Sequence, residues 1–442
     1  MSNVSTVNKL LEQIQALSVA IEEQKRVLFD LEQRRSNARM TLNSYLDPMA
    51  RLPLEIQSQI FLDVEPGTAS KVPHPLAAPM VFLTISRLWH AIALAIPRLW
   101  TALKIEALPR RAGYIELCNL WIQRTQSLPL LLSLEGARGS LLLDPNTQDL
   151  VTRHRDGLES LNLGLSVTRW DNLYPERRIL VRGPFPALRT LRVHANEGIS
   201  FSKVDEWLDL LIAAPALTTC TFDNMSFNGM TRCTPAHRLV HPALRYLCFG
   251  EAYTFSSRLT HGNTATLLKY VTLPALQTLR ITNLDIKESE FISFLARSSP
   301  PLRSLSLVFN QRWPPQFMSA IFKSMPTLTR LELVRASWSD PNFMLTLLTA
   351  AQDGALPLLH TLRVVMHAVR PYKIDYLRLS SILRTRRTTQ QTPLAVFQLC
   401  FPSKDVEIAK ESLNEEALAA FRQLAQDGLD IHIGPKEQNL VL

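Results

Sequence analysis

The sequence predicts an α/β fold made mostly of a solenoid, in which parallel strands line a concave face and helices lie outside. Three observations lead to this prediction: an eight-residue motif that recurs seven times, amphipathic segments between its copies, and a heptad spacing of apolar residues ahead of them. We expect residues 1–47 to form a heptad helix, residues 48–100 a small all-α bundle, and residues 101–442 the solenoid.

Length and composition are those of a folded protein. The chain has 442 residues, of which 46% are hydrophobic and 20% are charged, as is ordinary for globular proteins. The formal charge is +9, but basic residues cluster only briefly, at Arg110–Arg111, Arg177–Arg178 and Arg384–Arg387. Since no dense basic stripe with interleaved aromatic residues is present in the sequence, we expect solvated surface at these clusters and no nucleic-acid partner.

The cysteines and the apolar stretches indicate the compartment. Five dispersed cysteines are present, and Cys220, Cys248 and Cys400 fall in strand-like apolar runs, where a thiol acts as a small hydrophobic group. The first residues lack the apolar core of a signal peptide, and the most apolar stretch, Pro75–Trp100, includes Arg87 and other charged residues. We expect a reducing compartment, cytoplasmic or nuclear, without a membrane span.

A long helix is predicted at the beginning of the chain. Apolar residues there follow one another in alternating steps of four and three, as in the seam of a coiled coil. The seam positions are Leu10, Ile14, Leu17, Ile21, Gln24, Leu28, Leu31, Arg35, Ala38, Leu42 and Tyr45, and only Gln24 and Arg35 interrupt its apolar character. No glycine or proline occurs before Pro48, so we expect one helix of roughly 60 Å. A stripe this narrow needs a partner, either a second copy of the helix or the rest of the chain.

Two shorter helices are predicted between residues 48 and 100. The segment Leu52–Phe61 reads LPLEIQSQIF, and Pro53 suits the first turn of a helix, where its missing N–H is not needed. Ile56 and Ile60 then share one face of that helix. After a loop that contains prolines and glycine, a second apolar stretch with helical spacing runs from Met80 to Ile96.

A repeated motif, Pro-x-Leu-x-x-Leu-x-apolar, fills the rest of the chain. The copies read PALRTLRV from Pro186, PALTTCTF from Pro215, PALRYLCF from Pro242, PALQTLRI from Pro274, PPLRSLSL from Pro300, PTLTRLEL from Pro326 and PLLHTLRV from Pro357. The one exception is Cys220, which takes the place of the second leucine in its copy. Their spacings of 29, 27, 32, 26, 26 and 31 residues are close to the roughly 20–29 of leucine-rich repeats. Partial copies occur at Leu103–Ile105, Leu130–Leu134, Leu158–Leu163, Leu394–Leu399 and Leu429–Ile433. Together they predict about twelve coils.

Each part of the motif has a physical role in a solenoid. Leu191 and Val193 alternate toward one buried face, as a strand requires. Amphipathic helices are predicted at Val204–Ala213, Glu288–Arg297, Gln316–Ser324, Asn342–Ala351, Ile374–Arg386 and Glu415–Gln426. Ser412 stands three residues before Glu415, which is the spacing of a capping box. Because one unit cannot bury its apolar face alone, stacking of neighbours must supply the core. We expect the last helix and the tail after Ile433 to cap the end of the stack.

The sequence contains no motif typical of catalysis. It has no phosphate-binding glycine loop, no GxSxG and no HExxH. One metal-like cluster, Cys233-x3-His237-x3-His241 with Cys248 beyond, has zinc-type ligands but matches no common zinc finger. We expect no cofactor, no metal and no enzymatic activity, and we keep an enzyme built on this cluster as an alternative hypothesis.

The outward positions of the predicted strands are candidates for binding a protein substrate. They include the charged residues Arg192, Arg280, Arg330, Glu332 and Arg363. Hydroxyl-bearing residues, namely Thr190, Thr219, Thr221, Tyr246, Thr278, Ser304 and Thr361, lie among them. Arginines in register could bind an acidic or phosphorylated peptide segment through charge-assisted hydrogen bonds. The alternative is that these residues only keep the surface soluble.

The order of these segments resembles that of F-box proteins, in particular the large set found in mushroom-forming fungi. The resemblance is carried by LPLEIQSQIF from Leu52, by RLWHAIA from Arg87, and by PRLW from Pro97, ahead of leucine-rich repeats. It implies a substrate-receptor subunit of an SCF-type ubiquitin ligase. The F-box would dock on a Skp-type adaptor that links to a cullin, and the repeats would hold a protein substrate.

The resemblance also assigns residues to the adaptor contact. It places Leu52, Pro53, Ile56 and Ile60 at the adaptor-facing surface, with Leu88 and Trp89 divided between core and interface. The alternative hypothesis is a stand-alone leucine-rich repeat scaffold for protein–protein interaction, dimeric through the N-terminal helix. The two hypotheses differ in whether the chain binds the adaptor.

Overall fold

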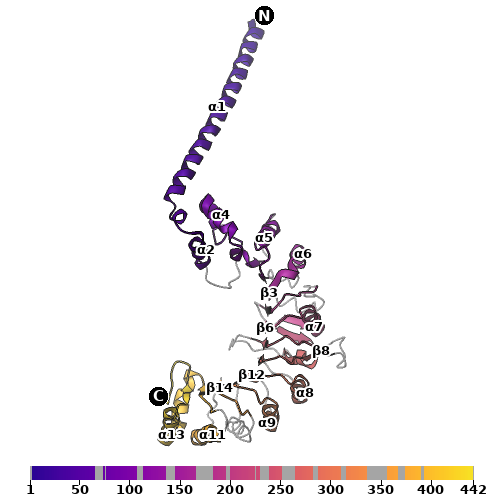
Figure 1. Ribbon diagram of the computed structural model, residues 1–442, viewed down its shortest axis with the longest axis vertical. Coiled ribbons are helices and arrows are strands. Elements are labelled where there is room, and N and C mark those ends of the chain that lie inside the picture. Colours follow the sequence, from indigo (N-terminus) through magenta and orange to yellow (C-terminus); the bar gives the residue numbers. More distant parts are fainter. Residues whose placement is uncertain are drawn as a thin grey trace. The chain divides into compact units, whose positions relative to one another are not determined.

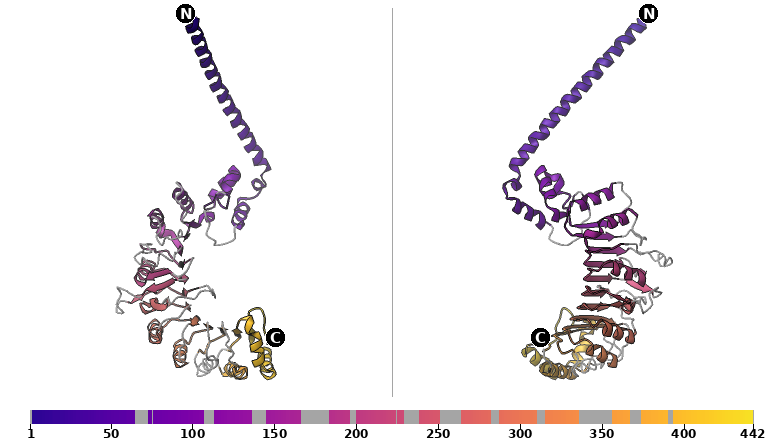
Figure 2. Two further views of the ribbon diagram at one scale, coloured as in Figure 1. Left: turned by 180° about the vertical axis from the view of Figure 1, so that it is seen from behind. Right: turned by 45° about the vertical axis from the view of Figure 1, so that its right-hand side comes forward.

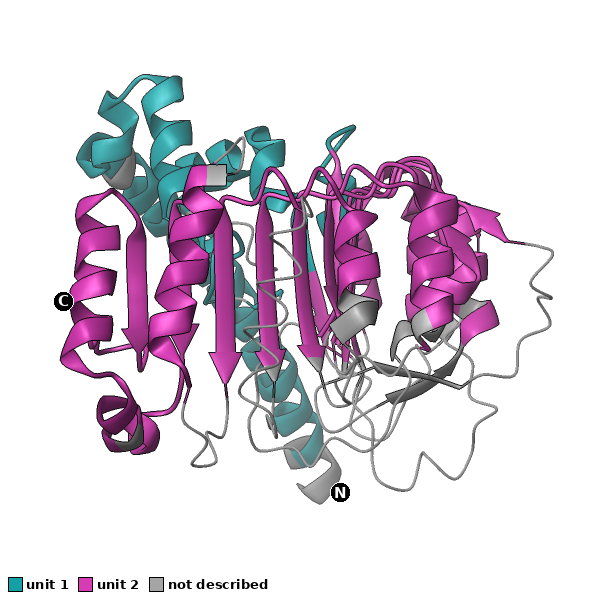
Figure 3. Ribbon diagram, turned by 90° about the horizontal axis from the view of Figure 1, so that it is seen from below, with its two compact units in different colours: residues 1–103, 120–128 teal, residues 104–119, 129–442 magenta. Residues whose placement is uncertain are grey.

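The computed structural model describes residues 2–64, 73–74, 76–106, 113–135, 145–165, 183–195, 200–223, 225–228, 238–250, 264–281, 287–309, 315–335, 356–366, 374–389 and 393–441. The chain divides into two compact units, residues 1–103 with 120–128 and residues 104–119 with 129–442 (Figure 3). In the described ranges, no helix combines the length and the apolar character that crossing a bilayer requires.

The first unit begins with the long helix α1, which runs from Ser2 to Leu46 (Figure 1). Its predicted seam lies at the surface, with exposed fractions of 53% at Leu10, 60% at Ile14 and 63% at Leu17. Ion pairs between neighbouring turns, such as Lys25 Nζ to Glu22 Oε1 at 2.8 Å, are solvated and therefore add little stability. The predicted helix is present, and its apolar seam is open to solvent at these positions.

The first unit continues as a bundle of short helices. They are η1 (Pro48–Arg51), α2 (Leu54–Asp63), α3 (Phe82–Ile85), α4 (Arg87–Ala95) and η2 (Pro97–Trp100). Pro53 occupies the N-cap of α2, one position before the predicted first turn. Ser86 caps α4, since its hydroxyl accepts the backbone N–H of Trp89. Phe61 and Trp100 are fully buried and anchor the core of the bundle.

The main sheet is parallel and follows the order of the repeats. Within the described residues it has 12 strands in the order β1-β2-β3-β4-β6-β9-β11-β12-β13-β14-β15-β16 (Figure 2). The strands are β1 (Ala102–Glu106), β2 (Leu130–Glu135), β3 (Leu158–Leu165), β4 (Thr190–Ala195), β6 (Thr219–Asp223), β9 (Tyr246–Phe249), β11 (Thr278–Ile281), β12 (Ser304–Phe309), β13 (Arg330–Arg335), β14 (Thr361–Met366), β15 (Val396–Cys400) and β16 (Asp430–Gly434). All seven motifs and all five partial copies supply a strand. This is a solenoid-like α/β arrangement.

Register explains why the repeated leucines are buried. Leu191 pairs with Cys220 and Cys220 pairs with Leu247, so each inward position stacks on the same position of the next strand. All three side chains are at most 1% exposed, and Cys220 acts as the predicted small hydrophobic group. In the next inward column, the rings of Phe222 and Phe249 stack with centroids 5.6 Å apart. The core of the second unit is therefore a set of apolar columns that run across the strands.

The helices of the second unit lie along one face of its sheet (Figures 1 and 2). The helices are α5 (Tyr114–Gln123), α6 (Pro145–His154), α7 (Val204–Ala213), α8 (Glu288–Ser298), α9 (Pro315–Lys323), α11 (Tyr376–Thr389), α12 (Val406–Ser412) and α13 (Glu415–Gln426), of which α5 crosses the boundary between the units. Five of the six predicted helices are present, and the predicted helix Asn342–Ala351 lies outside the described residues. Short 3-10 turns occur at Arg155–Gly157, Thr264–Lys269 and Ser403–Asp405.

Two small parallel sheets were not anticipated from the sequence. One pairs β5 (Ser200–Lys203) with β7 (Met225–Asn228), and the other pairs β8 (Leu239–Val240) with β10 (Val271–Thr272). These strands are only two to four residues long, so they have too few residues to show an alternating pattern.

The start of α13 differs from the prediction. Asn414, not Ser412, is its N-cap, and the Asn414 side chain accepts the backbone N–H of Ala417 at 2.9 Å. Ser412 instead ends the short helix α12. The capping-box spacing was misleading because a second helix ends immediately before α13, and the chain needs two residues to turn between them.

The tail after β16 covers the last strand of the sheet. The side chain of Asn439 accepts the backbone N–H of Ile433 at 3.1 Å and donates to the carbonyl of Ile431 at 2.7 Å. Leu440 N donates to Ile433 O at 2.8 Å, and Val441 is fully buried. Peptide groups that would otherwise form an open sheet edge are thus satisfied, which protects the edge from pairing with another chain.

One arginine cluster is not the solvated surface that the sequence suggested. Arg384 is exposed, but Arg386 is 1% exposed, and its Nη2 donates to the carbonyl oxygen of Leu356 at 2.7 Å. Burial lowers the pKa of the Arg386 guanidinium to about 10, so it remains charged at neutral pH. Arg386 therefore ties α11 to the turn that precedes β14. The clusters at Arg110–Arg111 and Arg177–Arg178 lie outside the described residues.

Candidate protein-docking site

An apolar stripe is exposed along α2. Ile56 is 49% exposed, Ile60 is 36% exposed and Val64, at the end of the helix, is 55% exposed. These residues are four apart, so they lie on one helical face, and the exposed Pro53 begins the same face. We call Pro53, Ile56, Ile60 and Val64 the α2 stripe. Contiguous exposed apolar residues of this kind mark interaction sites more often than isolated ones do.

The opposite side of α2 is held by an aromatic cluster. The ring of Phe61 lies 4.4 Å from that of Phe82 and 5.0 Å from that of Trp89, measured between centroids. The amide of Gln57 is buried and donates to the carbonyl oxygens of Met49 and Leu52 at 2.7 and 2.8 Å. Aromatic contacts and buried hydrogen bonds fix the orientation of α2, so the stripe is presented on a supported helix.

Asp47 connects three parts of the bundle and was missed by the sequence analysis. Its carboxylate accepts the backbone N–H of Met49 at 2.9 Å, the indole N–H of Trp89 at 3.3 Å and the hydroxyl of Ser86 at 3.4 Å. An aspartate directly before Pro48 is a recognisable helix-start signal. Its contact with Trp89 has no signal in the sequence, because 42 residues separate the two.

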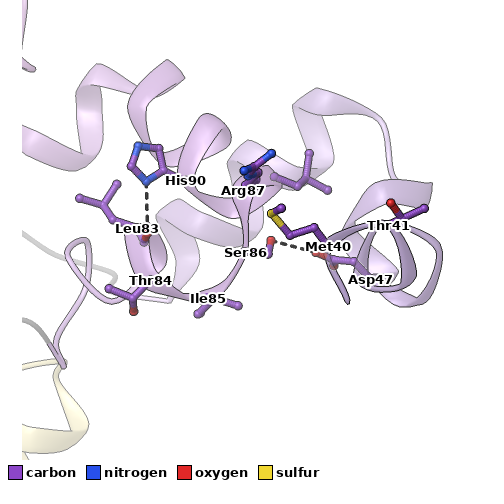
Figure 4. A pocket seen from close by; sticks show the side chains of 10 residues that line it. Met40, Thr41, Asp47, Leu83, Thr84, Ile85, Ser86, Arg87 and His90 are labelled. Atoms are coloured by element: carbon purple, nitrogen blue, oxygen red, sulfur yellow. Dashed lines mark hydrogen bonds between the residues drawn. The ribbon is translucent and has the colours of Figure 1, made fainter. Parts of the chain in front are cut away.

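A pocket of about 710 Å³ opens beside the bundle (Figure 4). It is lined by Met40, Thr41, Asp47, Leu83, Thr84, Ile85, Ser86, Arg87, Leu88 and His90. The imidazole Nδ1 of His90 lies 3.1 Å from the carbonyl oxygen of Leu83 and ties α4 to α3. The pocket lining mixes aliphatic and polar groups, which suits a partner side chain with an apolar body and a polar tip.

The residues predicted to contact an adaptor differ in their exposure and position. Pro53, Ile56 and Ile60 are exposed on α2. Leu52 is half-buried and precedes that helix, and its carbonyl oxygen accepts a hydrogen bond from the Gln57 side chain. Leu88 is half-buried in the pocket wall, and Trp89 is half-buried against the aromatic cluster. Which of these residues touch an adaptor stays a prediction.

On the face of the main sheet opposite the helices, two outward columns are mostly polar, and their charges are partly paired. Register places Asn162, Arg192 and Thr221 in one outward column. In the same column, Arg363 Nη1 contacts Glu332 Oε1 at 3.1 Å. Arg192 Nη2 contacts Asp223 Oδ2 at 3.2 Å, and Ser306 Oγ donates to Glu332 Oε2 at 2.8 Å. Two of the predicted substrate-binding arginines therefore already have a carboxylate partner.

The remaining predicted residues on this face differ in exposure. Arg280 is half-buried, whereas Arg330, the first residue of β13, is exposed. The sequence analysis passed over three further exposed arginines, Arg189, Arg245 and Arg303, which directly precede β4, β9 and β12. They occupy the same position in three copies of the motif, so the repeat itself was the signal that could have revealed them.

A polar network also crosses the sheet between neighbouring strands. Asn162 Nδ2 donates to Ser133 Oγ at 3.1 Å, and His194 Nδ1 lies 3.1 Å from Asn162 Oδ1. Burial, together with the positive charge of Arg192, lowers the pKa of His194, so its imidazole is neutral at pH 7. Gly164 leaves room beside it, since an added Cβ would stand 3.0 Å from the Glu135 side chain and 3.1 Å from the His194 ring, and these side chains would have to shift.

The metal-like cluster is only partly within the described residues. His241 is 2% exposed, and its Nε2 lies 3.0 Å from the carbonyl oxygen of Ala214, which is the position of a core histidine. Cys233 and His237 lie outside the described residues. In the part of the chain that the structure covers, no group of three or more His, Cys, Asp or Glu residues could hold a metal ion.

Comparison with known proteins does not identify a family. No protein-family model matches the sequence, and no curated protein matches it at a significant level. The function must therefore be argued from the residues and their arrangement.

Proposed function

We propose that this protein is a substrate-receptor subunit of an SCF-type ubiquitin ligase, with residues 48–100 acting as an F-box and residues 101–442 as leucine-rich repeats that hold a protein substrate. The observation that carries the proposal is the α2 stripe, an exposed apolar face that begins at a Leu-Pro pair and precedes the repeats. The F-box docks on a Skp-type adaptor, which links the receptor to a cullin.

The physical case for docking is the cost of leaving the stripe in water. Ile56 and Ile60 keep much of their apolar area exposed on a helix that Phe61 and Gln57 hold from behind. Covering that area with a partner is favourable at about 25 cal/mol per Å². A supported helix with a solvated apolar stripe is suited to fill a groove in another protein without rearranging first.

The case for substrate binding rests on the sheet. Helices cover one of its faces, and the outward columns of the other face carry charged and hydroxyl side chains. Because neighbouring strands repeat the same positions, these columns offer a mostly polar surface to a protein chain.

Co-expression with a Skp-type adaptor tests the proposal. The wild-type chain is expected to co-purify with the adaptor as a 1:1 complex, and Ile56→Asp combined with Ile60→Asp is expected to abolish co-purification. The matched control is Ile212→Asp combined with Val240→Asp, which alters two residues of the second unit that are 61% and 58% exposed. Retention of the complex by the α2 variant, or its equal loss in the control, would refute the docking site.

The alternative function, a stand-alone scaffold that dimerises through α1, is favoured by one observation. The seam of α1 has β-branched residues at Ile14 and Ile21 and leucine at Leu10 and Leu17, which is the pattern of a two-stranded parallel coiled coil. Light scattering of the full chain separates the two functions. A dimer that does not bind the adaptor would support the scaffold function. A monomer that binds the adaptor would support the substrate-receptor function.

A further inference from the structure

Four exposed arginines line the starts of strands in the main sheet. Arg189, Arg245 and Arg303 share one position of the motif. Strand β12 follows Arg303, and Arg330 is the first residue of the neighbouring strand β13. Backbone bonds hold this line in register, since Arg330 N donates to Arg303 O and Gln277 N donates to Arg245 O, at 2.9 and 2.8 Å. We call these four residues the arginine rim.

The rim belongs to a surface with a large excess of positive charge. From β4 to β14, the described strand-start and outward positions hold seven arginines and two carboxylates, an excess of five charges. The arginines are Arg189, Arg192, Arg245, Arg280, Arg303, Arg330 and Arg363, and the carboxylates are Asp223 and Glu332. With Glu159, which contacts Arg189, the excess is four charges, against +9 for the whole chain.

The paired and unpaired arginines of this surface occupy different places. Both carboxylates are engaged, Asp223 with Arg192 and Glu332 with Arg363. In the rim, Arg189 Nε forms a long, solvated ion pair with Glu159 Oε1 at 3.7 Å, whereas the described residues provide Arg245, Arg303 and Arg330 with no carboxylate partner. The rim is therefore where an outside carboxylate meets the least competition.

The spacing of the rim matches an extended peptide. Arg189 and Arg245 precede strands that are two positions apart in the sheet, and so do Arg245 and Arg303. At about 4.8 Å between strands, Arg189, Arg245 and Arg303 follow one another at about 10 Å, which an extended chain spans in about three residues, and Arg330 lies one strand, about 5 Å, beyond Arg303. Beside the rim runs a column of hydroxyls, namely Thr190, Thr219, Thr278, Ser304 and Thr361, which can bond to a peptide backbone.

We propose that the arginine rim binds an extended acidic protein segment that carries Asp or Glu at about every third residue. The inference deepens the proposed function, because it names the class of substrate that the repeats would hold. A single-stranded nucleic acid fits less well, since stacking on aromatic side chains supplies much of such binding. In the described part of these columns the only aromatic residue is Tyr246, apart from the imidazole of His360.

Fluorescence anisotropy on the purified full chain tests the proposal. The probe is a labelled peptide of repeated Glu-Ser-Gly units, long enough to span the rim, compared with a Gln-Ser-Gly peptide and an oligouridylate. Arg245→Glu with Arg303→Glu and Arg330→Glu is expected to weaken binding of the Glu peptide about tenfold or more. The matched control, Arg39→Glu with Arg98→Glu and Arg384→Glu, changes the net charge equally at exposed positions elsewhere and is expected to keep most of the affinity.

Several outcomes would overturn the proposal. Equal weakening in the two triple variants, or equal binding of the Glu and Gln peptides, would show that no localised acidic site exists. Tighter binding of oligouridylate than of the Glu peptide would make the surface a nucleic-acid site instead. Circular dichroism and the melting midpoint confirm that each variant is folded. The assay contains no adaptor, so a chain that fails to bind the adaptor but passes this assay would refute the ligase function alone.

Discussion

Leucines at regular spacing occur in α1 and in the main sheet, and they have opposite surroundings. Leu17 in the seam of α1 is 63% exposed, whereas Leu305 in β12 is fully buried. In α1 the spacing creates a stripe that the helix cannot cover by itself. In the sheet, Leu305 lies between Leu279 and Leu331 of the adjoining strands, so the repeat supplies its own partners. Periodicity thus defines an apolar face, but burial needs a neighbour.

Charged side chains show the same contrast. Arg34 of α1 contacts Asp30 at 2.8 Å, with both side chains more than half exposed. Arg386 of α11 is buried and donates to a backbone carbonyl. A solvated ion pair exchanges one polar environment for another and changes stability little. A buried guanidinium must be satisfied within the protein, so its removal has a larger effect.

The largest expected effect comes from removing a leucine of the main sheet. Leu279→Ala deletes a fully buried side chain between Leu247 and Leu305 and is expected to destabilise the second unit by about 3–5 kcal/mol. Leu17→Ala in α1 is expected to change the melting midpoint little. Denaturant unfolding followed by circular dichroism measures both. Similar losses of unfolding free energy in the two variants would contradict the contrast between α1 and the sheet, and would show that the seam of α1 is buried in solution.

The second expected effect concerns the buried arginine. Arg386→Leu removes the charge-assisted hydrogen bond to Leu356 O and leaves that carbonyl with only its bond from Leu359 N at 3.2 Å, so the expected loss is about 1.5–3 kcal/mol. Arg384→Leu, two residues away and exposed, is the matched control and is expected to have little effect. If the two variants unfold at the same denaturant concentration, the guanidinium of Arg386 is not buried as described.

A smaller effect is expected at the start of α13. Asn414→Ala removes the side chain that accepts the N–H of Ala417 and is expected to cost about 1 kcal/mol. Asn414→Asp keeps an acceptor at the same place, next to the positive end of the helix dipole, and should retain stability. A destabilised Asp variant beside an unaffected Ala variant would contradict the assignment of Asn414 as the cap. The same denaturation measurement applies.

The smallest effect is expected in the pH dependence of stability. The pKa of His194 is lowered in the folded state, so the unfolded chain binds a proton at higher pH than the folded chain does. The corresponding stability is present above the unfolded pKa of about 6.5 and is lost as the pH falls toward the lowered folded value. Melting midpoints between neutral and mildly acidic pH should fall less steeply in His194→Asn than in the wild type. An unchanged slope would show that His194 is solvated in the folded protein.

Much of the second unit could be predicted from the sequence, because the residues that define each strand lie within a single copy of the motif. Each copy of the motif sets its own strand, and identical copies can only stack in one register without breaking the leucine columns. The α2 stripe was also predictable, since Ile56 and Ile60 are on the same helix. The arginine rim could have been found by comparing the copies at one position.

Other parts of the candidate sites could not be predicted in this way. Asp47 accepts a hydrogen bond from Trp89, and Arg192 pairs with Asp223. No sequence pattern links the two residues of either pair. The predicted cap at Ser412 was wrong because two helices adjoin there, and the end of one determines where the next begins.

The sequence by itself determined the order of the main-sheet strands and of the amphipathic helices between their motifs, with the apolar face of each, because propensity and periodicity act within a few turns of chain. The tertiary structure alone decided which charges are neutralised, which arginine is buried and which polar groups meet. Those outcomes depend on distances between side chains from different elements, and such distances exist only after the chain has folded.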